Sequence, residues 1–216
     1  AGILVLCALT PPAYAAPRLA DCDAEGHAAV LYPAPAPSPL EARAIWLDAS
    51  LLRWPGVSPS GRFRLYHSAV GAVVAESDAR VRGGDGALAL EVFAGAVPAR
   101  VAASFRHVAD GVTLRTSADP ATLRALHRQQ LLLVQEDAGG RVIRASRLQS
   151  AAALDELYAA AGHAQLGATI ARGQTTFALW APTARNVALC IYDSGTASAR
   201  SLESMQFDAA TGAWTT

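Results

Sequence analysis

The chain has 216 residues, which allow one or two domains, and 52% of them are hydrophobic, so a chain without a packed core is excluded. Its 18 basic residues balance its 18 acidic residues. The resulting net charge of zero argues against a nucleic-acid-binding protein, because such proteins usually carry a basic patch or stripe.

Residues 1–15 have the pattern of a secretory signal peptide. The apolar run GILVLCALTPPAYAA ends in small residues, and Ala13-Tyr14-Ala15 matches the A-x-A cleavage pattern. We expect this signal peptide to be truncated, because the initiator Met and the basic start are missing. The protein is then exported, either secreted or held in the periplasm or cell envelope. The alternative is a membrane helix, but the run is short of the ~20 apolar residues that a span needs, so we expect no stable membrane span.

Export would place the cysteines in an oxidising compartment. Cys7 would leave with the signal peptide, while Cys22 and Cys190 remain. These two residues are able to pair with each other, with a further cysteine or with nothing, and the sequence leaves the three alternatives open. For Cys190, in an apolar strand, the pattern favours a small buried hydrophobe. We expect no lipid anchor on Cys7 or Cys22, since Leu6 and Asp21 stand where a small residue is needed.

Residues 16–41 are expected to form a linker, because YPAPAPSPL alternates proline with small residues and favours extended polyproline II. From Ala42 the chain changes to short apolar runs bounded by turns, which predicts a β-sandwich over residues 42–149. The expected strands are ARAIWLD, LLRWPG, GRFRLYHS, AVVAESDARV, GALALEVF, ARVAASF and GVTLRTS, with RGGDG as a hairpin turn between the fourth and fifth.

The end of this sandwich combines a helix and a hairpin. In SADPATLRALHRQQ, Asp119 is placed to cap a helix and Pro120 suits its first turn. The segment LLLVQEDAGGRVIRASRLQ then predicts two strands joined at Gly139-Gly140.

Residues 150–167 predict a linker helix, and residues 168–216 predict a second β unit. Leu154, Leu157 and Tyr158 share one helical face, with Gly162 placed to end the helix. The stretch TTFALWAPTARNVALCIYD predicts a strand, a corner at Pro182 and another strand. Because residues 168–216 provide about half of the ~100 residues of an immunoglobulin-like sandwich, we expect a truncated module and a chain that is a fragment of a longer exported protein.

Titratable residues give no candidate catalytic or metal site. The five histidines fall on different expected elements and include no H-E-x-x-H pattern. RGGDGALALE lacks the repeated ligands of a calcium loop, and the sequence has no phosphate-binding glycine loop or nucleophile elbow. The carboxylates of Asp110, Asp119, Asp155 and Glu156 form no recognisable acid–base pair. We therefore predict no catalytic residue, metal or cofactor in this chain.

Aromatic rings are the remaining candidates for function, since a flat sugar-binding surface uses exposed rings. The candidates are Trp46, Trp54, Tyr66 and Trp180. Trp54 is the predicted carbohydrate-binding residue because it ends a strand just before a Pro-Gly corner, where a ring is able to project into solvent. Core packing is the alternative for Trp54, and it is the prediction for Trp180 and for Trp46, which lies inside an apolar run.

Three segments resemble, in this order, the N-terminal part of one enzyme family. AIWLDASLLRWPG…FRLYHSAVG resembles the N-terminal β-sandwich of bacterial type I pullulanases and plant limit dextrinases. LQSAAALDELYAAAGHAQLG is similar to the linker that follows that sandwich. TTFALWAPTARNVALCIYD resembles the opening of the family 48 carbohydrate-binding module that precedes the barrel of debranching enzymes in glycoside hydrolase family 13.

The resemblance implies a mainly all-β chain taken from the non-catalytic N-terminal part of an α-1,6-glucosidase. Such an enzyme hydrolyses branch linkages in pullulan, amylopectin, limit dextrins or glycogen, using two carboxylates in a retaining mechanism. Both carboxylates belong to a (β/α)₈ barrel that would follow Thr216, so the resemblance assigns no catalytic residue here. Whether these modules bind glucan or brace the barrel stays open.

Two alternatives remain beside this interpretation. One is a stand-alone carbohydrate-binding or cell-surface β-sandwich protein without catalysis. The other is a branching or isoamylase-type enzyme, which the resemblance over residues 42–165 disfavours.

Overall fold

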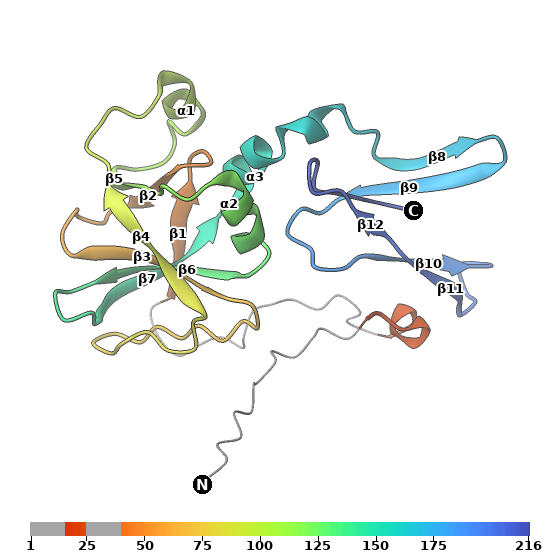
Figure 1. The fold of residues 1–216 in the computed structure, drawn as a ribbon, viewed down its shortest axis with the longest axis horizontal. Helices are drawn as coiled ribbons and strands as arrows, with labels where there is room; N and C mark the ends of the chain where they lie inside the picture. Colours follow the sequence, from red (N-terminus) through yellow and green to blue (C-terminus); the bar gives the residue numbers. More distant parts are fainter. Residues whose placement is uncertain (1–15, 25–39) are drawn as a thin grey trace, which may run out of the picture.

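The computed structural model describes residues 16–24 and 40–216, so the expected signal peptide and much of the expected linker lie outside the described residues. In the described part, a β barrel is joined through short helices to a second β unit (Figure 1). The barrel strands are β1 (Leu40–Trp46), β2 (Leu51–Pro55), β3 (Arg62–Ser68), β4 (Gly86–Val92), β5 (Gly111–Arg115), β6 (Gln130–Glu136) and β7 (Val142–Gln149). The mainly β class is confirmed.

The strands of the first unit close into a barrel in the order β1-β2-β5-β4-β3-β6-β7, where we expected a sandwich. Strand β1 is antiparallel to β2 on one side and parallel to β7 on the other. This last pairing closes the ring and leaves no free edge. The predicted hairpin about Gly139-Gly140 is confirmed, because β6 and β7 pair antiparallel across it.

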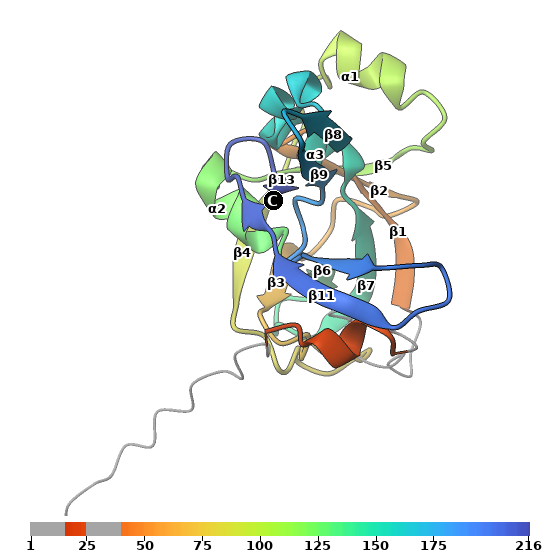
Figure 2. The same ribbon diagram turned by 90° about the vertical axis from the view of Figure 1, so that its right-hand side faces the viewer.

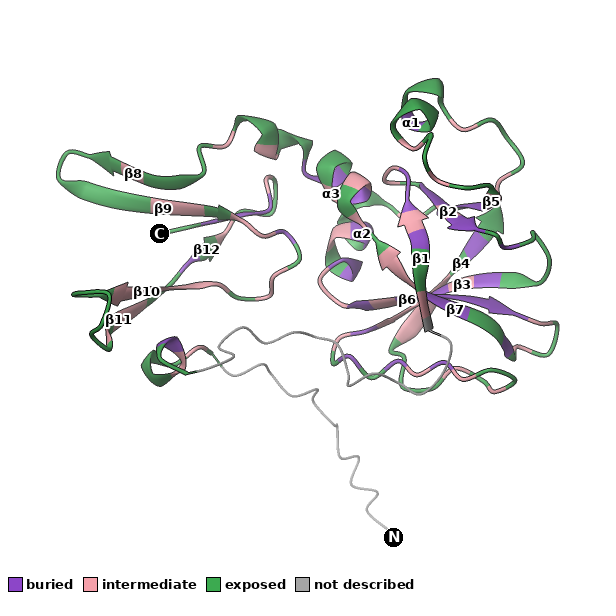
Figure 3. Cartoon of the chain, turned by 180° about the vertical axis from the view of Figure 1, so that it is seen from behind, coloured by how far each residue is buried: buried purple, intermediate pink, exposed green. Residues whose placement is uncertain are grey.

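The barrel interior is built by alternation along the strands, since residues two apart point to the same side. Phe63 and Leu65 of β3 point inward, as their pattern predicts, and Leu52 and Trp54 of β2 join them. Other interior residues are Ala44, Trp46, Leu90, Val112, Leu114 and Leu133. Figure 3 shows buried segments, in purple, along the strands of the barrel.

The segment AVVAESDARV is not the expected strand, and RGGDG is not the turn of a hairpin. Val74 and Arg82 form only an isolated bridge. The Gln130 side chain hydrogen-bonds both backbone polar groups of Val73. It accepts from the Val73 N–H at 2.8 Å and donates to the Val73 carbonyl at 3.2 Å. Val73 and Ala75 cover a second apolar cluster that includes Leu132, Val134, Val142 and Ala145. The segment therefore covers the outside of the barrel, and β4 pairs with β3 and β5 instead.

The expected strand ARVAASF is also wrong, because α1 (Ala99–Ser104) is a helix. Val101 is buried against Leu47 and Leu51, with Phe105 packed against the same cluster. Val101 and Phe105 are four residues apart, which places them on one helical face. The alanine-rich segment thus satisfies a helical period where we expected strand alternation.

The predicted helix at Asp119 is confirmed as α2 (Pro120–Leu126). The Asp119 carboxylate caps it by accepting from the N–H groups of Ala121 at 2.9 Å and Thr122 at 3.0 Å. The linker helix divides into α3 (Ala151–Leu157) and a 3₁₀ turn, η2 (Ala159–His163). Tyr158 lies between them and is buried.

The second unit contains a four-stranded sheet in the order β12-β13-β9-β8 and a separate β10–β11 hairpin. Its strands are β8 (Gly167–Ala171), β9 (Gln174–Trp180), β10 (Ala188–Tyr192), β11 (Ala199–Ser204), β12 (Gln206–Phe207) and β13 (Ala213–Thr215). The strand, corner and strand predicted around Pro182 correspond to β9, the following turn and β10. The immunoglobulin-like topology stays a prediction.

A disulfide joins Cys22 to Cys190 across 168 positions of sequence, so the expectation that Cys190 is an unpaired buried hydrophobe is wrong. Cys22 ends a short 3₁₀ helix, η1 (Leu19–Cys22), which lies beside β11 (Figure 2). This part of the expected linker is therefore attached to the second β unit. Among the described residues, no helix combines the length and apolar character that crossing a membrane requires.

Candidate functional site

The predicted sugar-contacting ring of Trp54 is fully buried, with 0% of its surface exposed, so the expectation that it projects from the domain is wrong. Trp54 shares its side of β2 with Leu52, and its ring meets the Phe63 ring edge-on at 6.4 Å. Pro55 and Gly56 turn the chain after Trp54 but do not rotate its side chain outward. The burial of the Trp54 ring argues against direct contact with glucan.

The other two tryptophan candidates are buried or half-buried. Trp46 is fully buried, as expected, and Trp180 is half-buried with its indole N–H donating to the Thr211 carbonyl at 2.9 Å. Over residues 16–24 and 40–216, Tyr192 is the one phenylalanine, tyrosine or tryptophan classed as exposed. The described surface therefore has no pair of neighbouring exposed rings on which a sugar chain could stack.

Tyr66 belongs to a polar cluster on the outer face of the barrel. Its hydroxyl donates to the buried Glu136 carboxylate, which also pairs with Arg64 Nε at 3.3 Å. Partial burial, and then the hydrogen bond to Glu136, raise the pKa of Tyr66 to about 12. Because the two Glu136 oxygens are each engaged, the cluster holds the outer face together and offers no free acid–base pair.

Three of the four carboxylates considered from the sequence have structural partners. Asp119 caps α2, Glu156 accepts from the Ala49 N–H at 2.8 Å, and Asp110 lies 3.7 Å from the Arg53 guanidinium. Within the described ranges, no group of three or more histidine, cysteine or acidic side chains is placed to hold a metal ion.

His127, at the end of α2, is buried beside the Trp46 ring at 5.2 Å. Its Nδ1 donates to the Leu123 carbonyl at 2.8 Å, which leaves Nε2 as an acceptor without a hydrogen-bond partner. Burial lowers the pKa of His127. The neutral ring is therefore part of the core at the point where the chain leaves α2.

The next residue, Arg128, makes the main polar contact between the barrel and the second β unit. Its guanidinium donates from Nε to the Ala184 carbonyl at 3.0 Å and from Nη2 to the Arg185 carbonyl at 3.1 Å. Arg185 Nε donates back to the Arg128 carbonyl at 2.9 Å. We call this contact the α2 corner and define it by Arg128, Ala184 and Arg185.

Aromatic packing extends the α2 corner. The Arg128 guanidinium lies 4.5 Å from the centre of the Phe207 ring, and Phe207 packs against Trp214 at 5.0 Å. Nearby, Gly212 has a φ of +70°, and an added Cβ would come within 2.9 Å of the Tyr158 ring. Glycine is therefore required for this close approach.

The cores of the two units are continuous through these residues. Leu157 and Tyr158 belong to the barrel core, and Trp180 and Phe207 of the second unit pack against it. Sequence reasoning missed Arg128, because its partners are backbone carbonyls more than fifty positions away. The arrangement fixes two β units against each other and contains no reactive group.

Two family models match the chain. The model of the pullulanase N2 domain matches residues 41–156, which include the barrel. The model of carbohydrate-binding module 48, also described as the isoamylase N-terminal domain, matches residues 165–216, which include the second β unit.

Two curated proteins are similar over most of the chain. The pullulanase of Klebsiella pneumoniae is 30% identical over 174 residues, or 80% of this chain and 15% of that protein. Pullulanase 1, chloroplastic, of Arabidopsis thaliana is 32% identical over 150 residues, or 69% of this chain and 15% of that protein. The chain thus spans about 15% of the length of these relatives.

Solved pullulanase structures match the chain at a sequence identity of about 30%. The apo pullulanase of Klebsiella pneumoniae matches with a TM-score of 0.70 and 30% identity, covering 82% of this chain and 19% of that one. PulA from Klebsiella oxytoca matches with a TM-score of 0.69 and 30% identity, covering 82% and 16%. A Klebsiella pneumoniae pullulanase crystallised with maltotriose gives a TM-score of 0.70 at 30% identity, covering 82% and 16%.

Proposed function

The chain belongs to the pullulanase N2-domain family, and from this premise we propose that its parent protein is an exported pullulanase-type glycoside hydrolase acting on α-1,6 bonds. The observation that carries the proposal is the order of the two family matches, with the N2 domain at 41–156 followed by the carbohydrate-binding module at 165–216. The described region then contributes no catalytic residue. Its relatives are several times longer, which leaves room for a separate catalytic domain.

The proposed substrates are α-glucans with α-1,6 linkages, namely pullulan, amylopectin, limit dextrins or glycogen. The maltotriose complex of the Klebsiella pneumoniae relative supports this class. To test the proposal, the product of the complete reading frame and the present chain are each incubated with pullulan, and reducing ends are measured. We expect release by the complete product only. No release by the complete product would favour the stand-alone binding protein, and release by the present chain would refute its non-catalytic assignment.

For the described region itself, we propose that it braces the catalytic domain instead of binding glucan directly. The burial of Trp46 and Trp54 and the packed α2 corner support this role. Native electrophoresis of the chain through gels containing pullulan or amylopectin provides the test. We expect the same mobility as in a gel without polysaccharide, and clear retardation would show that a glucan site is present.

Export is supported by the A-x-A pattern at Ala13-Tyr14-Ala15 and by the Cys22–Cys190 disulfide, which suits an oxidising compartment. N-terminal sequencing of the protein recovered outside the cytoplasm is expected to begin at Ala16. Recovery of the protein only from the cytoplasm, with its leader intact, would contradict export.

A further inference from the structure

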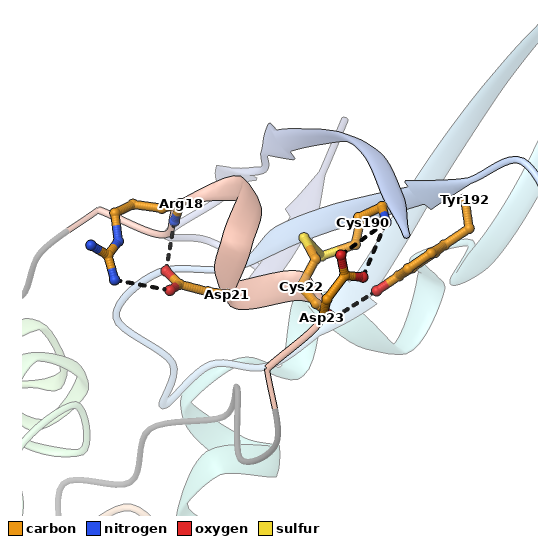
Figure 4. The surroundings of a disulfide bond; sticks show 7 residues. Arg18, Asp21, Cys22, Asp23, Cys190 and Tyr192 are labelled. Carbon is orange, nitrogen blue, oxygen red and sulfur yellow. Dashed lines mark hydrogen bonds and ion pairs between the residues drawn. A yellow bond between two sulfur atoms is a disulfide. The ribbon is translucent and has the colours of Figure 1, made fainter. Parts of the chain in front are cut away.

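Residues 16–24, which we call the N-terminal strap, are held on the β10–β11 hairpin by three kinds of contact (Figure 4). Cys22 forms the disulfide with Cys190 of β10. The Tyr192 hydroxyl donates to the Cys22 carbonyl at 2.7 Å. The Ala199 N–H of β11 donates to the Asp23 carboxylate at 3.0 and 3.2 Å. The strap therefore contacts both strands of the hairpin.

The hairpin has little other sheet support. β10 and β11 form a two-stranded sheet separate from the four-stranded sheet, and a two-stranded hairpin is only marginally stable on its own. The ladder is irregular between Ile191 and Tyr192, where Tyr192 pairs with Ala199. Tyr192 and Ala199 both hydrogen-bond to the strap, so the strap reinforces the hairpin at its irregular end.

The strap has few means of staying in place without its covalent bond. Its helix η1 has 4 residues, and such short 3₁₀ segments do not persist alone. Arg18 and Asp21 pair with each other, within the strap. Cys22 is its one buried residue, with 8% of its surface exposed. The hydrogen bonds of Cys22 and Asp23 to the hairpin then act against the conformational entropy that ordering costs at every position.

We propose that the Cys22–Cys190 disulfide is a redox-controlled latch for the strap. A dithiol reductant transfers two electrons to the disulfide and becomes a disulfide itself, while the two cysteine sulfurs take up two protons and separate as thiols. The strap then leaves β10–β11, and the hairpin loosens at Tyr192 and Ala199. The strand pairing of the barrel and the hydrogen bonds that define the α2 corner involve no residue of 16–24, so we expect them to persist.

The latch lies directly behind the expected signal peptide, so its redox state would follow the export of the protein. This link to the compartment rests on the proposed export. The strap begins directly after the expected cleavage point at Ala15. In a reducing cytosol the cysteines would be thiols and the strap undocked. After export, a disulfide oxidant of that compartment would accept the two electrons and two protons, become a dithiol and close the latch. The latch therefore closes only in the compartment where the proposed enzyme works. The tests below use the purified chain, so their outcome does not depend on whether export takes place.

Peptide mapping tests whether the latch forms. All basic residues are arginine, so trypsin produces peptides 19–43 and 186–200, each with one cysteine. We expect mass spectrometry of the air-oxidised chain to find these peptides joined, and dithiothreitol to separate them. Failure to find the joined peptide in the oxidised chain would overturn the proposal.

Limited proteolysis of the folded chain tests what the latch does. We expect reduction to accelerate trypsin cleavage after Arg18 in the strap and after Arg200 in β11 by about tenfold or more, since local opening controls such cleavage. Cleavage after Arg64 in β3 is expected to stay slow. Unchanged cleavage at Arg200 would overturn the latch, and equal acceleration at Arg64 would show a general loss of stability instead.

A matched pair of variants distinguishes the effect of losing the disulfide from other effects of the reductant. Cys7→Ser removes the third cysteine and keeps the latch, so we expect the same response to dithiothreitol as in the unmodified chain. In Cys7→Ser/Cys22→Ser/Cys190→Ser, cleavage at Arg200 is expected to be fast with and without reductant, with the barrel still resistant. A triple variant that is cleaved as slowly as the oxidised chain would refute the latch.

Discussion

Replacing Arg128 by alanine is expected to loosen the second β unit from the barrel. The substitution removes two charge-assisted hydrogen bonds, to the carbonyls of Ala184 and Arg185, and the contact with the Phe207 ring at 4.5 Å. Hydrogen bonds from a charged group contribute about 1.5–3 kcal/mol each and an arginine over a ring about 0.5–2 kcal/mol, while water replaces part of both, so we expect a loss of about 2–4 kcal/mol.

This loss is measured by hydrogen exchange of backbone amides, which reports local opening. We expect amides of β12 and β13 to exchange about 30-fold to 1,000-fold faster in Arg128→Ala, since about 1.4 kcal/mol corresponds to a factor of ten. Amides of β3 are expected to be unaffected. Arg106→Ala, at an exposed position near α1, is the matched control for removing one arginine.

The lysine variant tests the geometry of the contact. Arg128→Lys keeps the positive charge but loses the planar fork that reaches two carbonyls together, so we expect it to recover only a minor part of the protection. Equal exchange rates in β13 for Arg128→Ala and Arg106→Ala would refute the assignment of Arg128 to the contact between the units. Full protection in Arg128→Lys would show that charge alone is sufficient.

Three further substitutions test the barrel. Trp54→Ala is expected to cost about 3–5 kcal/mol of unfolding free energy, as for other buried tryptophans, and urea unfolding that shows no loss would contradict the core assignment. Because the pKa of Tyr66 is raised from 10.0 to about 12, its contribution to stability is full below pH 10 and is lost as the pH rises toward 12. Stability measured over that range should fall less steeply in Tyr66→Phe. The lowered pKa of His127 has the opposite consequence: its contribution is full above the usual value of 6.5 and is lost as the pH falls below it. His127→Asn, which keeps a donor for the Leu123 carbonyl, should flatten the fall in stability toward acid pH. An unchanged dependence of stability on pH would argue against the assignment to His127.

The parts of the fold that the sequence predicted are those decided by neighbouring residues. Phe63 and Leu65 alternate with polar residues in β3, and alternation sets which side of a strand is buried. Asp119 caps α2 through groups two and three positions away. These patterns predict the structure because each signal and its structural partner lie within a few residues.

The parts that the sequence missed depend on distant partners. Trp54 looked exposed beside a Pro-Gly corner, but the closure of the barrel surrounds its ring. Val73 looked like a strand residue, and the Gln130 amide, 57 positions away, takes its backbone bonds. The Cys22–Cys190 pair stayed one of three alternatives, because spacing alone does not show which segments meet in space.

In the described part of the chain, two separate contacts of the second β unit bear on the proposed bracing role. At the α2 corner, Arg128 and a continuous apolar core hold it against the barrel. At the β10–β11 hairpin, a covalent bond holds it to the segment that precedes the barrel. A unit fixed at one place is free to pivot about that contact, whereas a second attachment on a different element restricts the pivot. Because the bond at the hairpin can be reduced and the contacts at the α2 corner cannot, the rigidity of the brace depends on the redox state at one end only.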